Sequence, residues 1–285
     1  MIEEWLKKYS PKTDADCRNA LREIMQEVAL AGLYRANFFK EAAFYGGTAL
    51  RIFYKLPRYS EDLDFSLLAI RPSFKLEKYL GAVVLEFQSL GLNVTVKPKE
   101  KTNKTAIESA FLKAETSWHE IILEKTPALN FLKGAISMKI KFEVDTNPPL
   151  GFITEQKLLL KPFSCYINCF SLPDLFAGKM HALLFRKWKN RVKGRDWFDL
   201  EWYIKSEVKL NLKHLQERAI QSTDWDAKKE MTESDLRNLL KKKIKSVSFS
   251  SIKDDTKKFI PNPNELEIWN EQYFLDLIEH LQVYE

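Results

Sequence analysis

Two aspartates separated by one residue, Asp62 and Asp64, are the residues of this sequence best suited to metal chemistry. They lie in segment 61–68, which has the character of a β-strand. Side chains two residues apart on a strand point to the same face, so both carboxylates would project together while Leu63 and Phe65 turn into the core. Such a pair can bind Mg²⁺ and leave its remaining positions to water and phosphate oxygens.

A glycine pair, Gly46 and Gly47, precedes these aspartates and is followed by Thr48. Glycine has no Cβ, so the backbone can approach a phosphate closely, and Thr48 would offer a hydroxyl at the start of a helix whose unpaired amides face an anion. Each motif alone is common in loops or at strand edges. The glycine pair followed by the two aspartates, with an apolar helix between them and Arg51 nearby, favours a metal-dependent site for a nucleoside triphosphate.

The segment from Gly46 to Phe65 resembles the first motif of the AbiEii-type nucleotidyltransferases. These are toxin components of bacterial abortive-infection and type IV toxin–antitoxin systems, within the polymerase-β-like nucleotidyltransferase superfamily. A second, helical motif of the same family begins at Lys179. This sequence departs from the family at Gly178, where many relatives carry an acidic residue just before that lysine. The matching residues are Gly46, Gly47, Thr48, Leu50, Arg51, Arg58, Ser60, Asp62, Asp64 and Phe65 in the first motif, and Lys179, Ala182, Leu183, Arg186, Arg195, Asp196, Asp199 and Leu200 in the second.

The resemblance implies an α+β fold: a mixed sheet of the nucleotidyltransferase type with flanking helices over residues 1–160, then a helical domain over 161–285 that contributes the second motif. It implies a third carboxylate, from a strand beside the two aspartates. The family's Lys-x-acid pattern falls on Glu143, with Asp145 on the same strand face as the alternative. The alternative is that Glu143 and Asp145 belong to a charged outer strand face and have no catalytic role.

The implied reaction moves a nucleoside monophosphate from an NTP to an acceptor, with Mg²⁺ or Mn²⁺ held by Asp62, Asp64 and Glu143. Lys179 would reach the triphosphate, and Asp196 would complete the site or orient that lysine. Arg58 and Ser60 could instead orient the strand of aspartates, and a salt-bridged helix pair is the alternative for the second motif. The nucleotide-binding residues expected are Gly46, Gly47, Thr48, Arg51, Ser60, Lys179 and Arg195.

The composition is that of an ordinary folded protein: 285 residues, 45% of them hydrophobic. The sequence has no apolar run of 18 residues and no secretory signal pattern at its start, so we expect a cytoplasmic protein without a membrane contact. Its three cysteines have no zinc-ligand spacing, and a structural disulfide is not expected.

The net charge of +6 is concentrated between Lys179 and Arg195, a stretch that contains no acid. Basic surface near a nucleotide site favours a polyanionic acceptor such as RNA, plausibly a tRNA 3′ end. We therefore expect the toxin of an AbiE-like system with a possible cognate antitoxin. One alternative is a nucleotidyltransferase that acts on a small molecule or a protein. The other is a non-catalytic RNA-binding protein on the same scaffold. The basic residues of this stretch are Lys179, Arg186, Lys187, Lys189, Arg191, Lys193 and Arg195.

The elements that must position these residues follow from hydrophobic periodicity and caps. Thr13 is expected to cap the first long helix and Ser171 a later one, and from Pro162 onwards the pattern predicts helices only. The predicted helices cover 14–32, 48–54, 73–91, 171–189 and a segment from Arg195; the predicted strands cover 39–45, 61–68, 92–96, 105–114 and 135–145; and 246–258 is predicted as a flexible loop.

Overall fold

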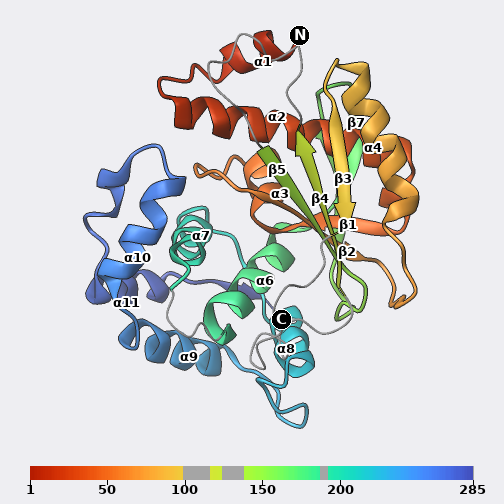
Figure 1. The fold of residues 1–285 in the computed structure, drawn as a ribbon. Coiled ribbons are helices and arrows are strands. Elements are labelled where there is room, and N and C mark those ends of the chain that lie inside the picture. The colour runs from red at the N-terminus through yellow and green to blue at the C-terminus, as the bar shows by residue number, and fades with distance from the viewer. Residues whose placement is uncertain (99–115, 124–137, 187–191, 285) are drawn as a thin grey trace. The chain divides into compact units, whose positions relative to one another are not determined.

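The computed structural model describes residues 1–98, 116–123, 138–186 and 192–284 (Figure 1). The chain forms two compact units. Unit 1 comprises Met1–Lys55, Tyr59–Pro148 and Thr154–Cys169, and unit 2 comprises Leu56–Arg58, Pro149–Ile153 and Phe170–Glu285.

Unit 1 is built on a mixed sheet, which confirms the predicted fold class. Over the described residues its strand order is β3-β4-β5-β2-β1-β7-β6. β2 is antiparallel to β1 and parallel to β5, so the strand of the two aspartates lies between them. The strands are β1 (Ala42–Tyr45), β2 (Asp62–Leu67), β3 (Val94–Pro98), β4 (Thr116–Leu123), β5 (Met138–Asp145), β6 (Thr154–Leu159) and β7 (Cys165–Phe170).

The two faces of the sheet differ in polarity. On β5, buried Ile140, Phe142 and Val144 alternate with more exposed Lys141 and Glu143. The apolar face joins one core with helices α1 (Ile2–Lys8), α2 (Asp14–Arg35) and α4 (Glu77–Ser89). A single hydrophobic core therefore holds one face of the sheet, and the opposite face is left for charged side chains.

The start of α2 is fixed as predicted. The Thr13 side chain accepts a hydrogen bond from the Asp16 amide, and the Asp16 carboxylate accepts one from the Thr13 amide. This reciprocal pair satisfies two of the amides that have no partner within the helix. The helix continues to Arg35, slightly beyond the predicted end.

Unit 2 is mainly helical, with a two-stranded parallel ribbon of β8 (Leu210–Asn211) and β9 (Val283–Tyr284). Its core contains aromatic rings, with Trp197 and Trp269 both packing edge-on against Phe274. The helices are α6 (Leu172–Phe185), α7 (Gly194–Lys205), α8 (Leu212–Gln221), α9 (Glu233–Lys245), α10 (Phe249–Thr256) and α11 (Glu271–Glu279). Short 3₁₀ turns lie at Phe38–Lys40 in unit 1 and at Lys257–Phe259 and Pro263–Leu266 in unit 2.

The prediction of helices alone after Pro162 is wrong for β7 and for the two short strands β8 and β9. In β7 Tyr166 is exposed between buried Cys165 and Ile167, and Cys169 pairs in parallel with Phe44 of β1. The strand was missed because its exposed face is short and its pairing partner is distant in sequence. Unit 1 consequently continues past the boundary predicted at residue 160.

Other boundaries also differ from the sequence pattern. The predicted strand 39–45 is a 3₁₀ turn followed by β1, and the helix expected from Ser73 begins at Glu77. α6 ends at Phe185 rather than at residue 189 because Arg186 has an extended backbone. The predicted loop 246–258 contains α10, whose first turn is capped by the Ser248 side chain. The predicted strand 105–114 lies outside the described residues.

Across the stretches that the structure describes, no helix has the length and hydrophobicity needed to cross a membrane.

One buried residue of unit 2 has an unusual titration. His214 is almost fully buried, and its ring lies 5.9 Å from the Phe152 ring and 6.0 Å from the Phe170 ring, centroid to centroid. Within the described residues neither of its ring nitrogens has a hydrogen-bond partner. Burial lowers the pKa of His214 to about 3, and the positive charge of Arg218 acts in the same direction. The imidazole is therefore neutral in the folded protein at neutral pH.

We expect His214 to make the stability of the protein decrease in acid. The unfolded chain takes up this proton near pH 6.5 and the folded chain only near pH 3, so the free energy of unfolding falls as the pH decreases between these values. His214→Phe keeps an aromatic ring and removes the titration. Thermal unfolding measured from about pH 7 to about pH 5 should show a smaller loss of Tm in the variant than in the wild type. Equal losses in the two proteins would contradict this assignment.

Candidate active site

The turn that joins β1 to α3 (Gly46–Tyr54) admits only glycine at its first helical position. Gly46 has φ +81°, in the region that side-chain-bearing residues rarely adopt. A Cβ atom at this position would lie 2.3 Å from Oδ2 of Asp64 and 3.0 Å from its Cγ. The strand register explains this close approach, because Tyr45 and Asp64 are direct partners across β1 and β2. The glycine turn and the second aspartate are thus one structural feature.

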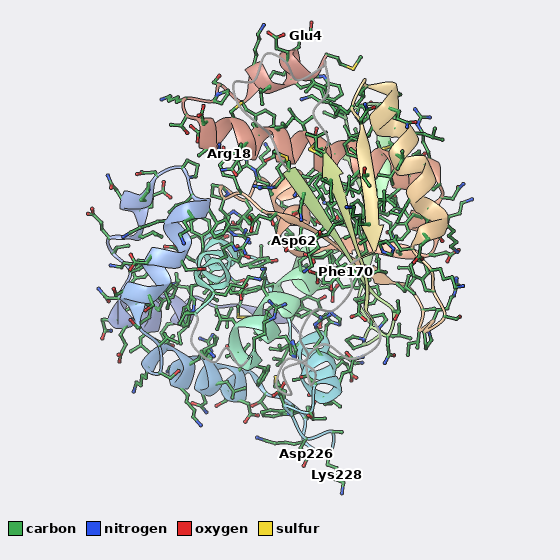
Figure 2. The ribbon with its side chains drawn as sticks, in the orientation of Figure 1. Glu4, Arg18, Asp62, Phe170, Asp226 and Lys228 are labelled. Carbon is green, nitrogen blue, oxygen red and sulfur yellow. The ribbon has the colours of Figure 1, made fainter. Side chains whose placement is uncertain are left out.

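Asp62 and Asp64 lie on the polar face of β2, as predicted. Both are half-buried, whereas Leu63 and Phe65 between and beyond them are fully buried. Asp62, labelled in Figure 2, is the first residue of the strand. Their side chains belong to the same face because strand residues alternate.

Glu143 is the register partner of Asp64 across the parallel β2–β5 pair. Partners in register share a face, so Glu143 lies on the polar face next to the aspartates. Asp145 shares this face but is paired with Ser66, one step further from Asp62. The backbone therefore places Glu143 nearer than Asp145 to the level of the two aspartates.

The Glu143 carboxylate is held by a neighbour that the sequence reasoning did not assign. Lys141, two residues away on the same strand face, forms an ion pair with it. The only sequence signal for this contact is the period-two spacing of the Lys-x-Glu pattern. The lysine neutralises a carboxylate that would otherwise add to the negative charge of the aspartates.

The donor set on this face fits a hard divalent cation. In the described part of the chain no three His, Cys, Asp or Glu side chains gather closely enough to hold a metal ion by themselves. Mg²⁺ and similar ions are commonly held by one or two carboxylates, with substrate phosphates and water as the other ligands. Asp62 and Asp64 supply such a pair of carboxylates, and the absence of a side chain at Gly46 lets the Asp64 carboxylate lie directly against the backbone of the glycine turn.

Thr48 and Ser60 are engaged in the framework of the site. The Thr48 side chain is fully buried, and its hydroxyl donates a hydrogen bond to the Asp62 carbonyl oxygen. The amide of Gln26 on α2 donates to the Ser60 carbonyl oxygen at 3.2 Å. Both contacts fix the beginning of β2, so they position the aspartates. Gly47, the second predicted glycine, is buried in the first turn of α3.

Arg51 also has partners inside unit 1. Its Nε donates to Oε2 of Glu23 on α2 at 2.7 Å, and its guanidinium lies 5.0 Å from the centroid of the Tyr59 ring. The other oxygen of Glu23 accepts a hydrogen bond from the Tyr9 hydroxyl at 3.2 Å. The predicted phosphate-binding arginine therefore also joins α3 to α2, a contact that no short-range pattern indicates.

The second motif forms a buried ionic network within unit 2. Nζ of Lys179 lies 3.2 Å from Oδ1 of Asp196 and 2.8 Å from Oδ2 of Asp199. Arg58 donates from Nε and Nη2 to the two oxygens of Asp199, each at 2.6 Å. The Arg58 and Asp199 side chains are 1% and 0% exposed, so this pair is withdrawn from water. Arg58 contributes to the support of Lys179, which the sequence did not indicate.

Electrostatics keep both carboxylates of this network charged. Burial alone would raise the pKa of Asp196 and of Asp199. For Asp196 the opposing charges of Lys179, Lys193 and Arg186 prevail, and for Asp199 those of Arg58 and Lys179 do. The pKa of each carboxyl group is consequently below its ordinary value.

The beginning of α7 is packed tightly against α10. A Cβ atom at Gly194 would lie 2.2 Å from Oγ1 of Thr256 and 2.3 Å from the Ile252 carbonyl oxygen, so only glycine fits here. The guanidinium of Arg195, a predicted nucleotide-binding residue, lies 4.0 Å from the centroid of the Phe259 ring. The basic residues Lys187, Lys189 and Arg191 lie outside the described residues.

Known protein families and solved structures include matches to this chain. The family described as "Nucleotidyl transferase AbiEii toxin, Type IV TA system" matches residues 28–277. The structure of MenT4, a nucleotidyltransferase toxin from Mycobacterium tuberculosis, is similar with a TM-score of 0.58 and 14% identity, over 98% of this chain and 89% of that chain. This similarity concerns the fold. JHP933 from Helicobacter pylori has a TM-score of 0.46 and 19% identity, over 90% of this chain and 88% of that chain. No curated protein matches the sequence.

The close approach at the glycine turn predicts a specific loss of stability. Gly46→Ala introduces a strained backbone, which costs about 1–3 kcal/mol, and adds the collision with Asp64. Gly81→Ala is the matched control, because a Cβ atom at Gly81 in α4 meets nothing within 4 Å. That control should be neutral or stabilising by roughly 0.5–1 kcal/mol.

Urea unfolding of the single variants and of Gly46→Ala combined with Asp64→Ala separates the two costs. The double variant should recover part of the loss, because it removes the two closest contacts of the new Cβ, with Oδ2 and Cγ, and leaves only the contact with Cβ of residue 64 at 3.1 Å. Equal destabilisation by Gly46→Ala in both backgrounds would show that the Asp64 carboxylate does not require the glycine.

Proposed function

This chain belongs to the AbiEii family of nucleotidyltransferase toxins of type IV toxin–antitoxin systems, and from that premise we propose that it transfers a nucleoside monophosphate from an NTP to RNA. The observation that carries the proposal is the pair Asp62 and Asp64 on one strand face, with the Asp64 carboxylate directly against the backbone of the glycine turn at Gly46. A site of carboxylates, glycine amides and cations suits phosphoryl transfer, which depends mainly on positioning and on charge neutralisation.

In the proposed site Asp62 and Asp64 hold Mg²⁺ or Mn²⁺, and Glu143 is the third carboxylate. Such ions activate the acceptor oxygen and stabilise the leaving pyrophosphate. Glu143 is paired with Lys141 in the structure, so its carboxylate can serve a metal only when this ion pair opens. Lys141 is then proposed to neutralise the Glu143 carboxylate when no other cation is near.

The backbone amides of Gly46 and Gly47 are proposed to bind phosphate oxygens at the start of α3. The amides of a first helical turn have no partner within the helix and face an anion with the positive end of the helix dipole. Thr48, Arg51 and Ser60 contribute to the same subsite by holding α3, α2 and the beginning of β2 in place. Direct contact of Thr48, Arg51 and Ser60 with the nucleotide remains part of the proposal.

The second motif is proposed to supply positive charge to the triphosphate through Lys179. Asp196 and Asp199 orient the ammonium group, and Arg58 holds Asp199 by two parallel hydrogen bonds. Arg195 is proposed as a further nucleotide contact. The buried network explains how one lysine is held in a single position despite its long flexible side chain.

RNA is the proposed acceptor because the chain carries a net charge of +6 and a cationic stretch inside the second motif. Neutralising RNA phosphates with lysine and arginine releases bound counterions, which drives association. A tRNA 3′ end in the cytoplasm is the acceptor we favour. A cognate antitoxin is the proposed partner, as the family description of a toxin–antitoxin system suggests.

The test is incubation of the purified protein with each labelled NTP, Mg²⁺ and total cellular RNA. The wild type should label a defined RNA band. Asp62→Asn and Asp64→Asn should each reduce the labelling by more than about 100-fold, since even residues behind a metal ligand typically contribute 10–100-fold. Asp226→Asn is the control, because Asp226 is exposed in the segment that follows α8 (Figure 2).

Full labelling by both aspartate variants would remove the proposed metal site. Label that appears in a small molecule or a protein instead of RNA would change the acceptor, and RNA binding without transfer of label would favour the non-catalytic alternative. Glu143→Gln and Asp145→Asn distinguish the two candidates for the third carboxylate, and we expect the larger loss in Glu143→Gln. Growth arrest on expression should be relieved by the same variants that lose transfer.

A further inference from the structure

One edge of the sheet in unit 1 is formed by β6, whose neighbour on the inner side is β7. Among the described residues no further strand pairs with the outer side of β6. The strand spans six residues, 154–159, and contains no proline that would prevent pairing along this side. The row of backbone amide and carbonyl groups on such an edge can accept a strand from another chain.

Large apolar side chains are exposed on the hairpin of β6 and β7. The Gln156 side chain donates to Oδ1 of Asn168 at 3.3 Å, so these two residues lie on one face of the neighbouring strands. Leu158 and Tyr166 are each two residues away from them along their strands and share that face. Leu158 is 48% exposed, Tyr166 58%, and Leu160, which follows β6, 66%. Neighbouring exposed apolar side chains favour burial against another surface.

The opposite face of β6 carries one acid and one base. Glu155 and Lys157 are two residues apart, and Nζ of Lys157 lies 2.8 Å from Oε2 of Glu155. The Tyr54 hydroxyl of α3 donates to Oε1 of Glu155 at 2.6 Å, and the Lys157 ammonium group lies 4.4 Å from the centroid of the Tyr54 ring. A lysine on an edge strand normally repels an incoming strand, but the charge of Lys157 is neutralised by its neighbour.

The charge pattern of β6 matches a second copy of the same strand. Two copies can pair antiparallel about a two-fold axis at Gln156, which places Glu155 of each copy opposite Lys157 of the other. An axis at Glu155 or at Lys157 would instead place like charges directly opposite each other, which destabilises a sheet. Registers centred further along the chain pair fewer residues of the strand. The register about Gln156 is therefore the self-complementary one.

We propose that this protein forms a two-fold dimer through β6, in which the seven-stranded sheets of two copies join edge to edge. Two cross-strand ion pairs between Glu155 and Lys157 set the register, and the exposed side chains of Leu158, Leu160 and Tyr166 border the joint on the other face. β7 and β1 lie between β6 and the strand of the two aspartates. Dimer formation is thus independent of the proposed nucleotidyl transfer.

Analytical ultracentrifugation of the full-length protein over a concentration series tests the dimer. The wild type should sediment as monomer and dimer in equilibrium. Glu155→Lys and Lys157→Glu each replace two opposite-charge pairs with like-charge pairs, so each should weaken dimerisation by about 10-fold or more. An equimolar mixture of the two variants should form a heterodimer with nearly the wild-type affinity, because the lysines of one chain then face the glutamates of the other.

Leu158→Glu tests the same edge without disturbing the contacts of Tyr54. Because Leu158 is exposed, this variant should keep the Tm of the wild type and lose affinity for the second copy. Leu85→Glu is the matched control, since Leu85 is an exposed leucine of α4 in the same unit and lies outside the hairpin. This control should dimerise like the wild type. The Tm of every variant, measured by circular dichroism, identifies any that has lost its fold.

A wild type that remains monomeric up to about 1 mM would overturn the proposal. A dimer with the same affinity in Leu158→Glu as in the wild type would assign the interface to another surface and equally overturn it. A mixture of Glu155→Lys and Lys157→Glu that associates no better than either variant alone would overturn the register about Gln156.

Discussion

The close approach of the Gly46 backbone to the Asp64 carboxylate is the constraint on which the polar site of unit 1 depends. Three features follow from it: β1 ends at Tyr45 opposite Asp64, α3 begins at once with a left-handed residue, and no side chain intervenes between the helix start and the carboxylate. The Thr48 hydroxyl adds a second tie, to the backbone at Asp62. The same turn therefore positions both the amides proposed to bind phosphate and the carboxylate proposed to bind the metal.

The two units use carboxylates in opposite ways. Asp62 and Asp64 are half-buried on one strand face, and the proposed function assigns them to a divalent cation. Asp196 and Asp199 are buried among lysine and arginine side chains that lower the pKa of both carboxyl groups. The negative charges of these two aspartates orient the neighbouring cations. A buried ion pair contributes little net stability but holds its members in one geometry when its hydrogen bonds are complete. Such a fixed geometry suits the phosphate-binding role proposed for Lys179.

Local chemistry made part of the structure predictable from the sequence. The cap at Thr13, the glycine turn at Gly46 and the alternation around Asp62 and Asp64 each depend on neighbours a few residues away. Contacts between distant segments were not predictable: β7 needed its pairing with β1, and Arg51 needed Glu23. The contact of Arg58 with both oxygens of Asp199 was hidden for the same reason, because the two residues are far apart in the sequence.

The central claim is that the Asp62 and Asp64 face binds a divalent metal beside the glycine turn. The most direct measurement is paramagnetic broadening of backbone amide NMR signals by substoichiometric Mn²⁺ in the presence of a non-hydrolysable NTP analogue. We expect the signals of Gly46, Gly47 and Asp64 to lose intensity first in the wild type and to retain it in Asp64→Asn. Broadening centred on another part of the chain, or identical broadening in the variant, would contradict the account.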